Sequence, residues 1–150
     1  MSDEATPLRP TDPLAHRALE ALVRAEATLT RRLAADLDRI GVSATGFAML
    51  VLLTSAGGEL ELRAIRRRLA ASKATAPEVL DTLDCRGFVN RSRLESDRRA
   101  VSVALTTAGH NLVTFAFPAH AERVREVFGG LDEAEKRQLA EICRKLDRAA

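Results

Sequence analysis

The basic side chains of this 150-residue sequence are concentrated in its middle. Residues 61–105 contain ten Lys or Arg and six Asp or Glu, a net charge of +4, whereas the rest of the chain has 13 basic and 15 acidic side chains, a net charge of −2. Lysine and arginine are the side chains that neutralise phosphate groups in nucleic-acid complexes. The pattern predicts that the middle of the chain contacts phosphates and that the flanking parts contact protein.

Residues that could support catalysis or bind a metal are few and scattered. Cys85 and Cys143 lack the paired spacing of a zinc site, and we expect both to be reduced, buried apolar side chains rather than redox centres. His16, His110 and His120 have no cysteine or carboxylate cluster near them in the sequence. No P-loop, dinucleotide-binding or Gly-x-Ser-x-Gly pattern is present. The sequence therefore predicts no enzyme, cofactor or metal site.

Composition and length predict one globular domain. The chain is 46% apolar and 29% charged, which is enough to form an ordinary core and too apolar for a disordered protein. It has no run of 18 apolar residues and does not begin like a secretory signal. These features predict a cytoplasmic protein with no membrane partner.

The elements that must position the basic residues begin with a long helix. Residues 1–10 show no periodicity and are expected to be a flexible arm. Asp12 and Pro13 are a good helix start, and apolar residues then recur every three or four positions up to Gly41. Such a helix would be about 40 Å long, more than a domain of this size can cover. Part of its apolar stripe is therefore predicted to contact a partner chain.

Three shorter helices are expected next. The first, capped by Ser43 or Thr45, is apolar on all sides and should be central to the core. The second covers residues 62–69 and carries four arginines, of which we expect one of the last three to contact phosphate. A turn at residues 70–72 leads to the third, which ends at Gly87.

The pattern then changes to a hairpin and two final helices. Residues 88–94 and 100–105 alternate like strands around a polar tip at residues 95–99. Thr106 should cap a helix that runs to Phe128 with a kink at Pro118, and residues 132–135 form a capping box before a last helix. The predicted fold is mainly α with a small β-hairpin, in the order of a winged helix-turn-helix protein.

Four segments of the sequence resemble the multiple-antibiotic-resistance regulator (MarR) family of bacterial transcription factors. They have the sequences SKAT (72–75), LDCRGFVNR (83–91), DRRA (97–100) and LTTAG (105–109). The resemblance implies a ligand-responsive repressor that binds a palindromic operator on double-stranded DNA as a homodimer. It also implies that residues 11–150 form one domain, with dimerisation helices in 11–42 and 107–150 and a winged DNA-binding region in 43–106.

The resemblance also implies which residues contact DNA. Its recognition-helix contacts fall on Ser72, Lys73 and Thr75, and its wing contact falls on Arg99, with Asp97 holding the tip of the wing. The sequence pattern predicts three further arginines as DNA contacts. Arg98 adjoins the wing contact, and the other two alternate on one face of a wing strand. These two are Arg91 and Arg93.

The expected recognition helix departs from the family pattern. Pro77 and Glu78 complete a capping box that would start the helix at Thr75, whereas the resemblance starts it nearer Ser72. Asp81 and Asp84 add negative charge to a helix that should face phosphates. We expect these two carboxylates to pair with Arg63 or its neighbours.

The acidic helix leaves an alternative open, namely a winged-helix dimer with weakened DNA binding that acts as a protein-interaction or ligand-binding module. In the family, small aromatic or phenolic effectors bind between the dimerisation helices and the winged region. No short motif defines that pocket, so effector-binding residues are not assigned. Five residues could line it by position and could equally belong to the core or the surface: His16, Arg17, Phe47, Met49 and Phe115.

Overall fold

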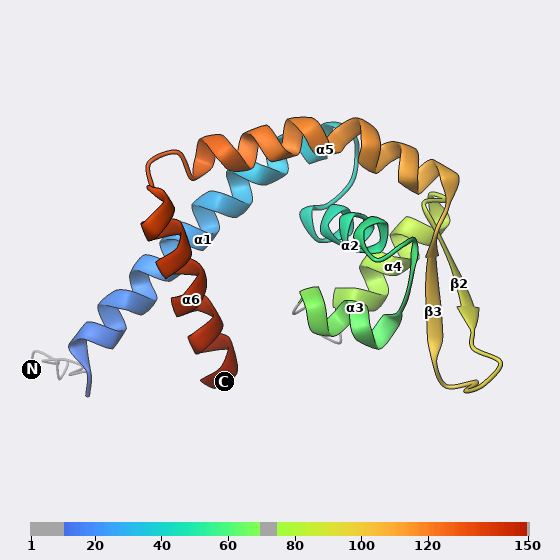
Figure 1. Cartoon of the computed structure of the whole chain (residues 1–150), viewed down its shortest axis with the longest axis horizontal. Coiled ribbons are helices and arrows are strands. Elements are labelled where there is room, and N and C mark those ends of the chain that lie inside the picture. Colours follow the sequence, from blue (N-terminus) through green and yellow to red (C-terminus); the bar gives the residue numbers. More distant parts are fainter. Residues whose placement is uncertain (1–10, 70–74, 150) are drawn as a thin grey trace, which may run out of the picture.

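The chain forms an arch in the computed structural model, which describes residues 11–69 and 75–149 (Figure 1). One foot of the arch contains the two ends of the described chain, the other contains a small winged unit, and one long helix spans the top. In order, the elements are α1 (Pro13–Arg39), α2 (Ala44–Ser55), β1 (Glu59–Glu61), α3 (Leu62–Leu69), α4 (Thr75–Cys85), β2 (Val89–Arg93), β3 (Val101–Leu105), α5 (Thr107–Val127) and α6 (Glu133–Ala149). The predicted class, mainly α with a small β wing, is confirmed.

Helix α1 begins where the sequence predicts. The Asp12 carboxylate accepts hydrogen bonds from the backbone N–H groups of Leu14 and Ala15, each at 3.0 Å, so it satisfies two amides that have no partner inside the helix. The helix ends at Arg39, slightly before the expected Gly41, and Gly41 has a positive φ of 68°. Glycine adopts this left-handed conformation without steric cost.

The core is built around α2, as its all-apolar sequence predicts. Phe47, Met49, Leu50 and Leu53 are each no more than 1% exposed. They pack with buried apolar residues of α3, α4, the sheet and α5, so α2 is the central element on which the winged unit is assembled.

The sheet has one strand more than expected. Besides the predicted hairpin of β2 and β3, strand β1 pairs antiparallel with β3, which gives the order β1-β3-β2. Val103 on the central strand is opposite Leu60 of β1 and Arg91 of β2. Because β1 is only three residues long, its sequence shows no strand periodicity of its own.

The last two helices start at the predicted caps. Thr106 accepts a hydrogen bond from Gly109 at the start of α5, which continues through Pro118 as a single bowed helix (Figure 1). Asp132 and Glu135 bond to each other's backbone N–H groups at 2.9 Å, which confirms the capping box before α6. No residue of α6 is buried in this single chain.

Among the described residues, no single helix is both long and apolar enough to cross a membrane. Helices α1 and α2 pass the length and composition test only as a pair, and they are bent by 79° relative to each other.

Candidate nucleic-acid interface

The expected recognition helix corresponds to α4. Its first described residue is Thr75, and Pro77 lies in its first turn. Residues 70–74, on which the choice between a start at Thr75 and one nearer Ser72 depends, lie outside the described residues. Two of the predicted DNA contacts, Ser72 and Lys73, lie outside the described residues. Helix α4 packs on α2 through the buried residues Leu80 and Leu83, and on β2.

The carboxylates of α4 pair with a wing strand and not with α3. Arg91 of β2 donates from Nε to Asp84 at 2.8 Å and from an Nη atom to Asp81 at 2.6 Å. Arg63, the partner expected from the sequence, contacts Glu61 instead, at 2.6 Å. The expected pairing was wrong because Arg91 reaches α4 across the packing of β2 on α4, a tertiary contact that the sequence does not reveal.

This ion pair has two consequences for the interface. The hydrogen bond to Asp84, opposed by partial burial and supported by Asp81, raises the pKa of Arg91. The guanidinium offsets one of the two negative charges, so α4 presents less negative charge to a polyanion than its sequence suggests. Arg91 itself is committed to an intramolecular contact, although its remaining N–H groups leave donors for other partners.

The wing tip is held by backbone and side-chain hydrogen bonds. The Asp97 carboxylate accepts from the backbone N–H of Arg99 at 3.0 Å, and the carbonyl of Asp97 accepts from the N–H of Ala100 at 2.9 Å. Arg93 donates to the carbonyl of Arg98 at 3.0 Å and so braces the tip from the strand. The guanidinium groups of Arg98 and Arg99 have no carboxylate partner among the described residues.

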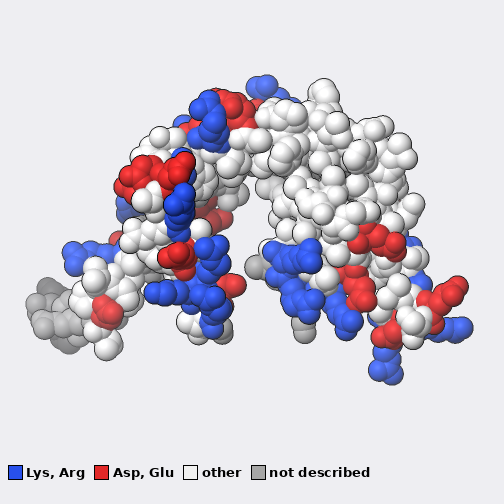
Figure 2. Space-filling view, viewed as in Figure 1, with Lys and Arg blue, Asp and Glu red and all other residues white. Residues whose placement is uncertain are grey.

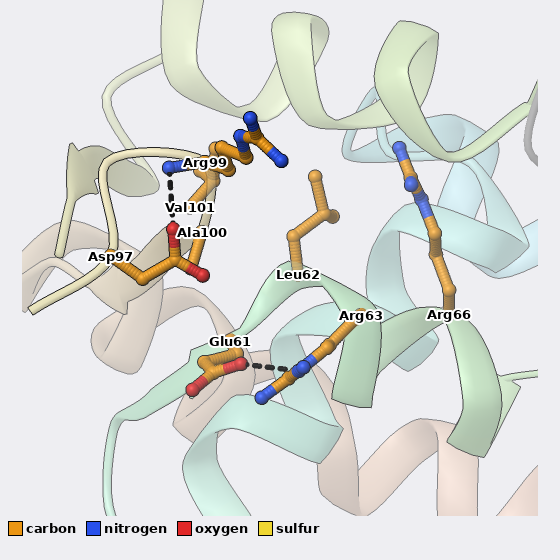
Figure 3. Close-up of a pocket in the computed structure, with 8 residues that line it drawn as sticks. All are labelled: Glu61, Leu62, Arg63, Arg66, Asp97, Arg99, Ala100 and Val101. Atoms are coloured by element: carbon orange, nitrogen blue, oxygen red, sulfur yellow. Dashed lines mark hydrogen bonds and ion pairs between the residues drawn. The ribbon is translucent and has the colours of Figure 1, made fainter.

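A cleft of about 280 Å³ separates the tip of the wing and the start of β3 from α3 (Figure 3). Arg66 of α3 and Arg99 of the wing lie on opposite sides of Leu62 in this cleft. The Nε atom of Arg66 is buried and has no hydrogen-bond partner among the described residues. A buried donor of this kind costs free energy until an acceptor reaches it. The sequence identified Arg66 only as one of a run of arginines, because its burial depends on the wing packed beside it.

The basic side chains of the winged unit gather on one edge of the molecule. Figure 2 shows arginine along the lower edge of that unit, below α3 and at the wing tip, with acidic groups among them. Arg67 and Arg68 of α3 and Arg98 and Arg99 of the wing are exposed. A basic edge formed by a helix and a wing matches the surface that a winged protein applies to the DNA backbone.

Both cysteines are exposed, which corrects the expectation that they would be buried. Cys85 is the last residue of α4 and points away from the core because Leu80 and Leu83 occupy the buried face. Cys143 lies on α6, in which none of the described residues is buried. No group of three metal-ligating side chains occurs in the described parts of the chain.

A second cavity, of about 490 Å³, lies between α1, α2 and α5. Its walls are mostly apolar, with polar groups from Thr30, Ser55 and His120. An apolar cavity with a few polar groups is typical of small-molecule sites. Of the five residues considered for such a pocket from the sequence, Phe47 lines it.

The other four residues considered for the pocket lie elsewhere. Met49 is fully buried in the core, and His16 and Arg17 are exposed on α1. Phe115 is 77% exposed and borders a smaller neighbouring pocket.

His120 is a polar group between these helices. Its ring meets that of Phe47 edge to face, with the centroids 5.1 Å apart. Burial lowers the pKa of His120 below 6.5, and the nearby Asp36 carboxylate partly opposes this shift. The neutral imidazole is therefore the form that the fold favours.

This shift predicts a pH dependence of stability. Well above pH 6.5 the ring is neutral in both folded and unfolded chains, whereas around and below pH 6.5 the unfolded chain binds the proton more readily. We expect the free energy of unfolding to fall between about pH 7 and pH 5, and His120→Gln to reduce that slope. Urea denaturation across this range measures it, with His16→Gln as the control. Equal slopes in all three proteins would contradict the prediction.

Comparisons with known proteins agree with this geometry. Residues 42–101 match the MarR family. The HTH-type transcriptional regulator YkoM of Bacillus subtilis is 33% identical over 110 residues, which cover 73% of this chain and 71% of YkoM. The transcriptional repressor MprA of Escherichia coli is 29% identical over 107 residues, which cover 71% of this chain and 61% of MprA.

A solved structure is similar over nearly the whole fold. It is that of BpsR from Bordetella bronchiseptica, whose DNA binding is regulated by 6-hydroxynicotinic acid. It superimposes with a TM-score of 0.79 and 26% identity, over 95% of this chain and 98% of BpsR.

Proposed function

Because the chain belongs to the MarR family of transcriptional regulators, we propose that it represses transcription by binding a palindromic operator as a homodimer. Two winged regions, residues 43–106 of each protomer, contact the duplex. Helices α1, α5 and α6 form the dimer. Ser72, Lys73 and Thr75 contact bases, and the wing residues contact the flanking groove and backbone.

The observation that carries this proposal is the wing tip. Asp97 fixes the backbone of the tip through the N–H of Arg99, while the guanidinium of Arg99 keeps all its donors free of carboxylates among the described residues. A fixed backbone that presents an uncommitted arginine suits insertion into a narrow minor groove, where the negative potential is enhanced. Arg98 and Arg93 flank this position and supply phosphate contacts.

The cleft between α3 and the wing is the second part of the proposed interface. The unpartnered Nε of Arg66 needs an acceptor, and a phosphate of the DNA backbone supplies one. Arg66 is therefore the one arginine of the α3 run that we assign to phosphate contact. The carboxylates at the rim of the cleft have partners of their own. Glu61 forms an ion pair with Arg63, although its buried Oε2 atom has no hydrogen bond among the described residues, and Asp97 accepts from the N–H of Arg99.

The test compares Arg99→Ala and Arg66→Ala with the wild type in a salt series on the DNA upstream of the protein's own gene and on a scrambled duplex. Arg99→Ala should weaken operator binding about tenfold and the scrambled duplex much less, because it removes a groove contact. Arg66→Ala should weaken binding to both duplexes alike. It should also reduce by about 0.9 the slope of the logarithm of the binding constant against the logarithm of the salt concentration.

Arg125→Ala is the control, because Arg125 is an exposed arginine of α5 that pairs with Glu122 within its own helix. It should leave both affinities close to those of the wild type. A wild-type protein that binds the two duplexes equally well at moderate salt would refute the proposed function.

We also propose that the cavity between α1, α2 and α5 binds a small aromatic or phenolic effector. Its walls include the exposed Phe117, which can stack on an aromatic ring, and His120, which can bond to a polar substituent. The regulation of the related BpsR by 6-hydroxynicotinic acid supports this class of ligand. An effector that shifts the relative positions of α1 and α5 lowers operator affinity through the spacing of the two recognition helices.

The acidic recognition helix that suggested a pure interaction module has a structural explanation. Asp81 and Asp84 share the positive charge of Arg91, so they brace the wing against α4 and repel phosphate less than two unpaired carboxylates would. This pairing favours the DNA-binding function.

A further inference from the structure

Arg86, directly after the end of α4, reaches across the fold to the end of α1. Its guanidinium donates one hydrogen bond to the carbonyl of Gly41 and another, of 3.2 Å, to the carbonyl of Ile40. The same group lies over the ring of Phe88, with the guanidinium carbon 4.9 Å from the ring centroid. Gly41 and Ile40 are 45 and 46 positions away from Arg86 in the sequence.

The contact has the chemistry of a helix cap supplied from another element. The last carbonyls of a helix have no partner inside it and carry partial negative charge. A planar guanidinium can bind at once the carbonyl of Ile40, the C-cap residue of α1, and that of Gly41, the next residue, and stacking on Phe88 fixes its plane. Gly41 permits this approach, since its φ is 68° and a Cβ atom there would lie 3.3 Å from a terminal nitrogen of Arg86.

The two helices that Arg86 connects have different roles. Helix α1 carries exposed apolar side chains for a partner chain and lines the cavity between α1, α2 and α5 through Leu33 and Leu37. Helix α4 is the candidate recognition helix, and its other packing is on α2 and β2. Arg86 is thus a direct link between the end of the recognition helix and the end of α1.

We propose that Arg86 is a positioning residue that holds the recognition helix at a fixed angle to α1. This inference rests on the proposed function. In the dimer, this contact of Arg86 with the end of α1, here called the joint, sets the separation of the two recognition helices. It therefore sets the half-site spacing that the protein accepts. It also lets a movement of α1, caused by a ligand in the cavity, reach α4.

The test measures selectivity for half-site spacing. Wild type, Arg86→Ala, Arg86→Lys and the control Arg39→Ala are titrated onto the operator and onto the same duplex with one base pair inserted between the half-sites. Arg39 is an exposed arginine in the last turn of α1, so the control removes the same charge close to the same helix end.

Arg86→Ala should lower the ratio of the two affinities about fivefold, because the recognition helices are no longer held at one separation. Arg86→Lys should restore only part of the ratio, since an ammonium cannot bind two carbonyls with a fixed plane. Arg39→Ala should keep the wild-type ratio. If Arg86 served stability alone, Arg86→Ala would weaken binding to both duplexes by the same factor. The ratio of the two affinities would then be unchanged, and this result would overturn the proposal.

Hydrogen exchange tests the joint without DNA. Arg86→Ala should speed exchange of the N–H groups of Gly41 and Val42, at the end of α1, and of Phe88, after α4. Unchanged exchange at either end would overturn the proposal. A wild type with no operator preference would refute the proposed function instead. The hydrogen-exchange result alone would then show whether Arg86 links α4 to the end of α1.

Discussion

Replacing Gly109 with alanine is expected to lower the free energy of unfolding by about 3 kcal/mol, the upper end of the usual range for overpacking. A Cβ atom at this position would lie 2.2 Å from the carbonyl oxygen of Phe88 and 2.8 Å from the Cδ1 atom of Leu105. The nearer atom belongs to the backbone and cannot rotate away. Denaturation in urea, followed by circular dichroism, measures the loss.

Gly130→Ala is the matched control for this substitution. Gly130 also lies close to the start of a helix, but a Cβ atom there would meet no atom within 4 Å. We expect a change within about 0.5 kcal/mol for this variant. A loss below about 1 kcal/mol in Gly109→Ala would show that α5 can move away from Phe88, contrary to the packing described above.

The contacts of Gly109 explain the Leu-Thr-x-x-Gly segment on which the family resemblance partly rests. The backbone N–H of Thr106 donates to the carbonyl of Phe88 at 3.1 Å, and its hydroxyl donates to the carbonyl of Gly87 at 2.6 Å. The hydroxyl also accepts from the N–H of Gly109, which starts α5. The segment therefore fastens α5 to the turn between α4 and β2, and Gly109 lets the helix approach this turn closely.

Local signals made most of the fold predictable. Asp12, Thr106 and the capping box at Asp132 and Glu135 all act within three residues of the backbone groups that they satisfy. Such short-range chemistry can be recognised from sequence alone. The apolar α2 was identified for the same reason, because its hydrophobicity needs no knowledge of its neighbours.

The features that the sequence did not reveal depend on long-range contacts. Arg91 was expected at the DNA, and nothing in its neighbourhood indicated that it would pair with Asp81 and Asp84 across a strand and a helix. Arg86 was one basic residue among many until the fold placed it at the end of α1. Pair contacts of this kind are fixed by the tertiary arrangement, which periodicity and capping do not specify.

Charging the apolar face of α6 is expected to abolish the dimer. Ile142 and Leu146, one turn apart, are 48% and 53% exposed, and no residue of α6 is buried in the single chain. The long α1 presents exposed apolar residues too: Leu14, Leu19, Leu22 and Val23. Uncovered stripes on two helices indicate a protein partner, and a second copy of this chain supplies matching stripes.

The double variant Ile142→Glu with Leu146→Glu should sediment as a monomer in the micromolar range, because four carboxylates would have to be buried at each dimer interface. Its operator affinity should fall by a factor of about 100 to 10,000. A monomer binds one half-site through a single winged region and loses the gain in affinity from a second, linked half-site. Arg137→Gln with Arg144→Gln changes the net charge equally on the opposite face of α6 and should stay dimeric. If the Ile142 and Leu146 variant also remained a dimer with unchanged operator binding, α6 would lie outside the interface, and the stripe of α1 together with Phe115 and Phe117 of α5 would have to form the dimer alone.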